Sequence, residues 1–331
     1  MALAAGLDRL VGDPRSWLHP VQVMGWLIGR LRGLSESWAG DHPRRLRLAG
    51  VLITVLLVGG SGLAGWQIER LAIDSRGPLA WLGAALLLIG LASAVAARSL
   101  ATAVRAVSSE LAANGPEALA NARARLGWIV GREVDRLGPG EILRAAAETA
   151  AENAVDGLFA PLFWMLVGAA LWQHWPQLPG PLALAWGFKA SSTLDSMLGY
   201  RRGRLRWLGC PGARLDDLLT WLPCRLVAAS LPLAAGRPGQ TLALLQLALL
   251  EGAADPSPNA GVSQAAYAHC ARVRLGGPNH YPGGRLVDKP LLARAEAAAD
   301  GLAVERILGL SDRLELIWLL AALGLGRLAG S

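Results

Sequence analysis

The chain has 331 residues, of which 53% are hydrophobic and 17% are charged, and its formal net charge is +7. An ordinary soluble domain has about 25% charged residues, so this composition argues against one and favours a membrane protein. The basic charge comes almost entirely from arginine, and no aromatic-interleaved basic segment indicates a nucleic-acid-binding protein.

Residues 1–47 mix short apolar runs with charges and turns, and Asp8 and Asp13 interrupt them too early for a signal peptide. Membrane spans are expected at 48–68 and 77–97, because neither segment contains a charged side chain and about 20 apolar residues cross a bilayer. Buried helices of a soluble core are the alternative interpretation. The arginines of the N-terminal region place that region on the cytoplasmic side.

Residues 98–152 form a polar, helical region that we expect on the cytoplasmic side. At its end Glu148, Glu152 and Asp156 are spaced four residues apart, which on an α-helix puts them on one face. Such carboxylates repel one another unless a cation lies among them, and Mg²⁺ prefers oxygen ligands of this kind together with substrate phosphates. A solvated or arginine-paired face is the alternative, because Arg144 precedes Glu148 by one helical turn.

The second half of the chain predicts membrane hairpins. Segments 157–198 and 218–252 each consist of an apolar helix, a turn rich in proline or glycine, and a returning helix. Residues 254–312 are then cytoplasmic, and 313–330 is a candidate last span. The sequence therefore predicts an all-α, polytopic integral membrane protein with helical hairpins and cytoplasmic helical and loop regions, in a single membrane-embedded domain over 1–331.

One group of ionisable and hydroxyl side chains interrupts apolar surroundings in the first hairpin. Lys189 is followed by Thr193, Asp195 and Ser196. Ionisable residues at membrane depth are costly and are functional candidates for that reason. A lysine that reaches the membrane surface along its apolar stem is the alternative.

A second group, Arg214, Asp216 and Asp217, comes just before the second hairpin. Adjacent carboxylates face different sides of a helix, so both seldom point at one ligand. The group is therefore a candidate site whose alternative is an Arg–Asp cluster at the membrane interface.

Two turn-rich loops carry exposed amide, hydroxyl and backbone N–H groups, at Ser257 and Asn259 and at Gly276 and Gly277. Loops of this kind can bind an anion, although generic turns have the same composition. The cysteines and histidines have no metal-binding or redox spacing, and the sequence contains no P-loop or Rossmann fingerprint.

Specific motifs recur in order along nearly the whole chain. They are Gly12-Asp13-Pro14, His19-Pro20-Val21, Ile129-Val130-Gly131-Arg132, Glu148-Thr149-Ala150-Ala151-Glu152-Asn153, Ala160-Pro161-Leu162-Phe163, Thr193-Leu194-Asp195-Ser196-Met197, Ala213-Arg214-Leu215-Asp216-Asp217, Ser257-Pro258-Asn259-Ala260-Gly261 and Leu275-Gly276-Gly277. With these motifs the sequence resembles the CobD/CbiB family of cobalamin biosynthesis, the adenosylcobinamide-phosphate synthases. It departs from the family pattern at Glu133-Val134, where Asp-Thr is usual, and at Ser191-Ser192, where Ile-Asn is usual.

The resemblance implies an inner-membrane ligase that uses ATP. The enzyme would join the propionate carboxyl of adenosylcobyric acid to (R)-1-amino-2-propanol or its O-phosphate, on the cytoplasmic side. Its partners would be these substrates, the lipid bilayer and other membrane proteins of cobalamin assembly, without nucleic acid. The cofactors that we infer are Mg²⁺ and ATP.

On this resemblance we assign hypothetical roles to the candidate residues. The magnesium ligands would be Glu148, Glu152 and Asp156. Further ligands, or the base that deprotonates the amine, would be Asp195, Asp216 and Asp217. Phosphate or the corrinoid acid would be held by Lys189, Arg214 and Arg132. Other substrate contacts would come from Asn153, Thr193, Ser196, Ser257, Asn259, Gly276 and Gly277.

Two other classes of function stay open. A transporter or binding protein for a corrinoid or another anion would carry ionisable residues deep inside its long spans, and segments 48–68 and 77–97 carry none. A non-catalytic subunit of a corrinoid-assembly complex would expose apolar loop faces, and sequence alone does not reveal exposure.

Overall fold

The computed structural model describes residues 1–12, 19–113, 115–281 and 285–329. Its contacts divide the chain into two compact units, each made of two segments. Unit 1 comprises Met1–Ala97 and Asp156–Thr220, and unit 2 comprises Arg98–Val155 and Trp221–Ser331. Asp13 and Pro14 of the first motif lie outside the described residues.

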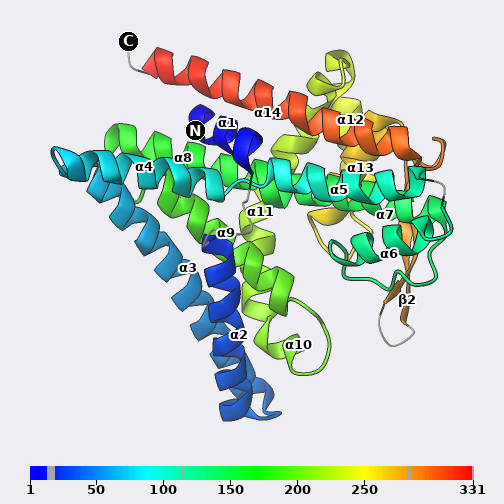
Figure 1. Ribbon diagram of the computed structural model, residues 1–331, viewed down its shortest axis with the longest axis horizontal. Helices are drawn as coiled ribbons and strands as arrows, with labels where there is room; N and C mark the ends of the chain where they lie inside the picture. Colours follow the sequence, from blue (N-terminus) through cyan, green and yellow to red (C-terminus); the bar gives the residue numbers. More distant parts are fainter. Residues whose placement is uncertain (13–18, 114, 282–284, 330–331) are drawn as a thin grey trace. The chain divides into compact units, whose positions relative to one another are not determined.

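Unit 1 is built almost entirely from helices (Figure 1). Its elements are α1 (Ala2–Val11), α2 (Pro20–Ala39), α3 (Pro43–Asp74), α4 (Pro78–Ser93), most of the π-helical turn η1 (Val155–Phe159), α8 (Ala160–His174), α9 (Pro181–Leu198), α10 (Leu205–Leu208) and the start of α11 (Cys210–Ala234). Proline stands in the first turn of α2, α3, α4, α8 and α9, where its missing N–H costs nothing.

Unit 2 combines helices with one β-hairpin. Its elements are α5 (Ala97–Ala112), α6 (Ala118–Gly127), α7 (Pro139–Ala154), the rest of α11, the short 3₁₀ turn η2 (Pro238–Gln240), α12 (Thr241–Gly252), α13 (Ala260–Ala271), β1 (Leu275–Tyr281), β2 (Arg285–Leu292) and α14 (Gly301–Ala329). The predicted all-α class is confirmed, because the hairpin is the single sheet among the described residues.

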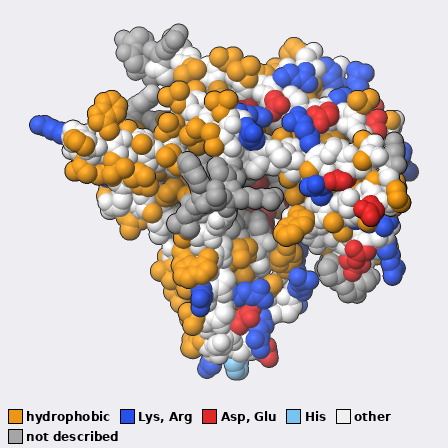
Figure 2. Space-filling view, viewed as in Figure 1, with side chains coloured by type: hydrophobic (Ala, Val, Ile, Leu, Met, Phe, Trp, Pro, Cys, Tyr) orange, Lys and Arg blue, Asp and Glu red, His pale blue; other side chains and the backbone are white. Residues whose placement is uncertain are grey.

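Three helical stretches of the described chain are long and apolar enough to cross a membrane: Pro43–Asp74, Pro78–Ala112 and Pro139–His174. The first contains the predicted span 48–68, and the second contains the predicted span 77–97 except Gly77. A helix of 32 residues such as α3 is about 48 Å long, which exceeds the hydrocarbon core of a bilayer, about 30 Å. Leu52, Val55 and Leu56 are exposed on α3, and Figure 2 shows hydrophobic side chains gathered where α3 and α4 lie in Figure 1.

Small residues bring the helices of unit 1 into close contact. A Cβ at Gly65 of α3 would lie 2.8 Å from the Cα of Ala183 on α9, and one at Gly83 of α4 would lie 2.6 Å from the Cα of Ala72 on α3. Any larger residue would push these backbones apart. Close approach at glycine is a common way of packing helices within membranes.

The helix α3 extends beyond the predicted span, to Asp74. The segment around Glu69 is therefore mainly helix. Glu69 is fully buried, and its carboxylate accepts hydrogen bonds from the backbone N–H groups of Gly180, Leu182 and Ala183 at 2.8, 2.6 and 3.1 Å. These groups begin α9, so a carboxylate of α3 caps the N-terminus of another helix.

Both predicted hairpin segments contain two helices joined by a turn. In the first, α8 and α9 lie side by side and are joined by a proline-rich turn (Figure 1). In the second, α11 ends at Ala234 and α12 begins at Thr241. Between them Gly236 has a φ of 70°, a conformation that glycine adopts without strain.

The predicted last span, 313–330, is the C-terminal part of α14, and residue 330 lies outside the described residues. The loop that we expected at 275–281 is instead strand β1, which pairs antiparallel with β2. The ladder is irregular between Leu275 and Gly277, where Gly276 and Gly277 have φ values of 84° and 95°. The two glycines therefore form a bulge near the start of the hairpin.

Candidate functional site

The predicted site residues fall into two groups, one in each unit. Glu148, Glu152, Arg132 and the loop residues belong to unit 2, whereas Asp156, Lys189 and the aspartates of α9 and α11 belong to unit 1.

In unit 2, Glu148 is buried on α7 and is fully engaged by basic groups and backbone. Its carboxylate accepts hydrogen bonds from Arg132 Nη2 at 2.5 Å, from Arg144 Nη1 at 3.2 Å and from the N–H of Gly276 at 2.9 Å. The side chain is 4% exposed. The arginine-paired face that the sequence left open as an alternative is therefore present at Glu148.

The two arginines also bind the β-hairpin. Arg132 donates to the side-chain oxygen of Asn279 on β1. Arg144 donates to the carbonyl oxygens of Gly276 at 2.5 Å and Pro278 at 3.0 Å. A Cβ at Gly276 would lie 1.9 Å from the carbonyl oxygen of Pro290. Only glycine therefore fits this position, from which the backbone N–H reaches Glu148.

Glu152 lies one turn further along α7 and contacts a second set of partners. It accepts a hydrogen bond from Gln264 Nε2 of α13 at 2.8 Å, and Lys289 of β2 forms an ion pair with Asp255 at 2.8 Å. Burial lowers the pKa of Lys289, but the attraction of Glu152 and Asp255 outweighs this effect and the pKa is raised overall. Lys289 therefore keeps its positive charge beside the two carboxylates. Asn153, next to Glu152, is partly buried.

The formal charges in this network of unit 2 balance. Three basic side chains meet three acidic ones: Arg132, Arg144 and Lys289 against Glu148, Glu152 and Asp255. Buried charges are tolerated when they are paired and hydrogen-bonded in this way. The network joins α7 to the β-hairpin, so its geometry favours a structural function.

The predicted loop residues Ser257 and Asn259 form hydrogen bonds at the start of α13. Ser257 Oγ accepts hydrogen bonds from the N–H groups of Asn259 and Ala260 at 3.4 and 3.2 Å. The side-chain oxygen of Asn259 accepts a hydrogen bond from Arg225 Nη1 at 2.5 Å. The guanidinium of Arg225 also lies 4.7 Å from the ring centroid of Trp221. The loop is therefore held by local contacts within unit 2.

In unit 1 the second group is centred on Asp216, in the first part of α11. Asp216 is 8% exposed, and its Oδ1 atom is buried without a hydrogen-bond partner among the residues that the structure describes. Burial and the negative charges of Asp156, Asp195 and Asp217 raise the pKa of Asp216 well above its usual range, while Lys189 opposes them. Three carboxylates and one lysine thus act on the charge of Asp216.

The neighbouring predicted residues of unit 1 have local roles. Thr193 Oγ1 donates to the carbonyl oxygen of Lys189 at 2.7 Å, and Ser196 Oγ donates to that of Ser192 at 2.9 Å. Both hydroxyl groups are therefore bonded within α9 itself. Arg214 is exposed on α11.

The three acids that we expected on one helical face have different surroundings. The helix is α-helical up to Ala154 and π-helical over Val155–Phe159, and the wider turn changes the direction of Asp156 relative to an α-helix. Among the described residues, no group of three His, Cys, Asp or Glu side chains is arranged to hold a metal ion. A magnesium ion at these acids would therefore need ligands from its substrate.

Sequence reasoning did not assign Lys289, Asp255 or Gln264 to a site, although they complete the network of unit 2. A signal for Lys289 was present, because Lys189 and Lys289 are the two lysines of a chain with thirty arginines. Each of the two lies beside carboxylates.

Comparison with known proteins gives a consistent result. The CobD/Cbib protein family matches residues 1–311. The "Cobalamin biosynthesis protein CobD" of Synechocystis is 42% identical over 87% of this chain and 80% of its own length. The "Cobalamin biosynthesis protein CbiB" of Salmonella typhimurium is 36% identical over 97% of this chain and 93% of its own length. No solved structure matches the chain significantly.

Proposed function

The chain belongs to the CobD/CbiB family of cobalamin biosynthesis, and we propose that it joins the propionate carboxyl of adenosylcobyric acid to the amine of (R)-1-amino-2-propanol or its O-phosphate. The product would be adenosylcobinamide or its phosphate. The family match supports the pathway. The observation that carries the chemical assignment is the buried, unpartnered oxygen of Asp216 within an excess of carboxylates.

A carboxylic acid does not react with an amine without activation, so the reaction needs an energy source. We assign that role to ATP, whose terminal phosphoryl group would convert the carboxyl to an acyl phosphate. Attack by the amine nitrogen then forms the amide bond and releases inorganic phosphate. The nitrogen must lose a proton, because an ammonium ion has no lone pair with which to attack.

The carboxylates of unit 1 suit the binding and deprotonation of this amine. Asp156 and Asp195 attract the ammonium form by their charge, and the unpartnered oxygen of Asp216 accepts its proton. A raised pKa makes a carboxylate a stronger base at neutral pH, which is the property that general-base catalysis requires. Lys189 would contact the phosphate of the activated acid or of the amine as a point charge.

Magnesium is compatible with the same residues in a limited way. Mg²⁺ is usually bound by one or two carboxylates, with substrate phosphates and waters completing its shell. Asp156 and Asp195 would offer such oxygens, which leaves Asp216 to act as the base. When bound, the ion would neutralise phosphate charge.

We place the protein in the inner membrane with this group of carboxylates at the cytoplasmic side. Four arginines, at positions 201, 202, 204 and 206, follow α9 within unit 1. Short arginine-rich segments next to membrane helices stay in the cytoplasm. Asp195 lies on α9, a few residues before these arginines. It would therefore be close to the cytoplasmic surface of the membrane.

The test is a reaction of detergent-purified protein with adenosylcobyric acid and Mg-ATP. Aminopropanol or its phosphate is the second substrate, and the corrinoid product is identified by mass. We expect a product that depends on ATP and a preference for one amine. Product without ATP would refute the ligase mechanism, and absence of product with both amines would refute the reaction.

The Asp216→Asn variant tests the base directly. Loss of a general base lowers rates by about 10²–10⁴-fold, and the asparagine removes a like charge from the group, so we expect normal folding. The matched control is Asp41→Asn, because Asp41 is exposed and paired with Arg204 in the same unit. Wild-type turnover in Asp216→Asn would exclude Asp216 as the base.

A further inference from the structure

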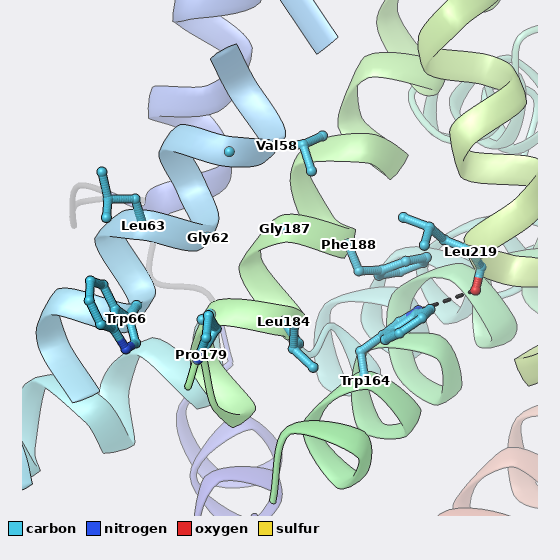
Figure 3. Close-up of a pocket in the computed structure, with 12 residues that line it drawn as sticks. Val58, Gly62, Leu63, Trp66, Trp164, Pro179, Leu184, Gly187, Phe188 and Leu219 are labelled. Carbon is cyan, nitrogen blue, oxygen red and sulfur yellow. Dashed lines mark hydrogen bonds between the residues drawn. The ribbon is translucent and has the colours of Figure 1, made fainter. Parts of the chain in front are cut away.

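A pocket of about 420 Å³ lies within unit 1, away from any charged lining residue. Helices α3, α8, α9 and the first part of α11 line it (Figure 3). Its described lining is apolar and includes Val58, Leu63, Leu184, Phe188 and Leu219. The volume is within the range of about 300–1,000 Å³ that is usual for ligand pockets.

Glycines leave this space open. Gly59 and Gly187 line the pocket, and a Cβ at Gly59 would meet nothing within 4 Å. A Cβ at Gly187 would meet only Val58, at 3.8 Å or more. These glycines therefore differ from Gly65, where a Cβ would collide with α9. Helix packing does not require them, and larger side chains there would fill the pocket.

The polar groups at the edges of the pocket are already bonded. Trp66 and Trp164 lie at opposite sides of it (Figure 3). Their indole N–H groups donate to the carbonyl oxygens of Gln177 and Leu219, each at 3.2 Å. The two tryptophans can therefore contact an occupant through the apolar surface of their rings. A polar ligand would lose its water here without gaining partners.

The level of the pocket in the membrane indicates the source of its occupant. Residues 58–66 lie in the charge-free part of α3, which is one of the membrane-crossing candidates. Val55 and Leu56 of the same helix are exposed, so at this level the protein faces hydrocarbon. An apolar cavity stays free of water and takes apolar guests.

We propose that this pocket binds one acyl chain of a bilayer phospholipid. A flexible hydrocarbon chain matches its apolar lining, and the bilayer supplies that chain at high local concentration. The corrinoid substrate, which carries many amide groups, does not match it. The inference is independent of the proposed reaction.

The test compares wild type with two variants that make the same change on neighbouring residues of α3. Gly59→Leu fills the pocket. Gly60→Leu is the control, since a Cβ at Gly60 also meets nothing within 4 Å and Gly60 does not line the pocket. Each protein is reconstituted with phosphatidylglycerol, returned to detergent, and weighed by native mass spectrometry.

We expect wild type and Gly60→Leu to keep one phospholipid through the detergent wash, and Gly59→Leu to lose it at least tenfold more readily. Equal retention by all three proteins would overturn the proposal. A phosphatidylglycerol with a diazirine on its acyl chain gives a second measurement. Labelling of peptides that contain 58–66 and 183–188 supports the site, whereas labelling spread over all exposed apolar helices identifies general boundary lipid and refutes it.

If Gly59→Leu does not fold, Gly187→Leu replaces it, because its Cβ also has room. The photolabelling of the wild-type protein needs no variant, so the proposal stays open to refutation in every case.

Discussion

The network around Glu148 allows a quantitative prediction. The Glu148→Gln substitution leaves the shape of the side chain almost unchanged but removes the negative charge between Arg132 and Arg144, both of which are mostly buried. Removing one partner of a buried ion pair costs about 3–5 kcal/mol, because the remaining charge is left uncompensated. Here two guanidinium groups lose the negative charge that they share, and the amide of glutamine replaces only one of the two acceptor oxygens.

This free energy converts to a clear change in thermal stability. A loss of 1 kcal/mol in the free energy of unfolding lowers the midpoint of thermal unfolding by roughly 2–4 °C in chains of 150–250 residues. The midpoint of Glu148→Gln should therefore fall by about 6–20 °C. The intrinsic fluorescence of the 13 tryptophans can follow unfolding in detergent during heating.

The matched control is Glu305→Gln. Glu305 also pairs with an arginine, Arg105, at 3.0 Å, but both side chains are about half exposed. Exposed pairs contribute about 0–1 kcal/mol, so the midpoint of this variant should move by less than about 4 °C. Equal midpoints for Glu148→Gln and Glu305→Gln would refute the structural function of Glu148. Full stability of Glu148→Gln combined with lost turnover would indicate that Glu148 has a catalytic function.

Two more substitutions test neighbouring conclusions. Glu69→Gln replaces a carboxylate that accepts three hydrogen bonds with an amide that has a single acceptor oxygen, so N–H groups at the start of α9 lose partners. At about 1–3 kcal/mol for each buried unpaired group, the thermal midpoint should fall clearly, and an unchanged midpoint would show that the cap is unimportant. Glu152→Gln keeps a hydrogen-bonding group opposite Gln264 but removes one of the two carboxylates beside Lys289, so we expect a lower thermal midpoint and retained turnover in the coupled assay. Lost turnover in a stable, folded variant would assign Glu152 to catalysis instead.

Local composition was sufficient to predict the helical membrane architecture. The segments 48–68 and 77–97 lack charge, and hydrophobic length alone decides whether a helix can cross a bilayer. Proline and glycine marked the turns of both hairpins because these residues fix or free the backbone directly. The β-hairpin was missed since Gly276, Gly277 and Pro278 at the start of β1 resemble a loop in sequence.

The partners of the carboxylates were harder to predict. Helical spacing placed Glu148, Glu152 and Asp156 on one face, but spacing does not specify what lies opposite that face. Arg132 and Lys289 reach the acids of α7 from outside that helix, and such contacts depend on tertiary structure. The prediction also assumed that residues four apart share one face of an α-helix. The π-helical turn at Asp156 departs from that geometry.

The positions of the two lysines have a practical consequence for chemical labelling. Amine-reactive cross-linkers and fluorophores usually modify many surface lysines without selectivity. In this chain they have Lys189, Lys289 and the N-terminal amine as targets, and each lysine is near carboxylates in a different unit. Because Lys289 is protonated, paired with Asp255 and only 16% exposed, its labelling should be slow, and faster labelling on addition of substrate would report that the network of unit 2 has opened.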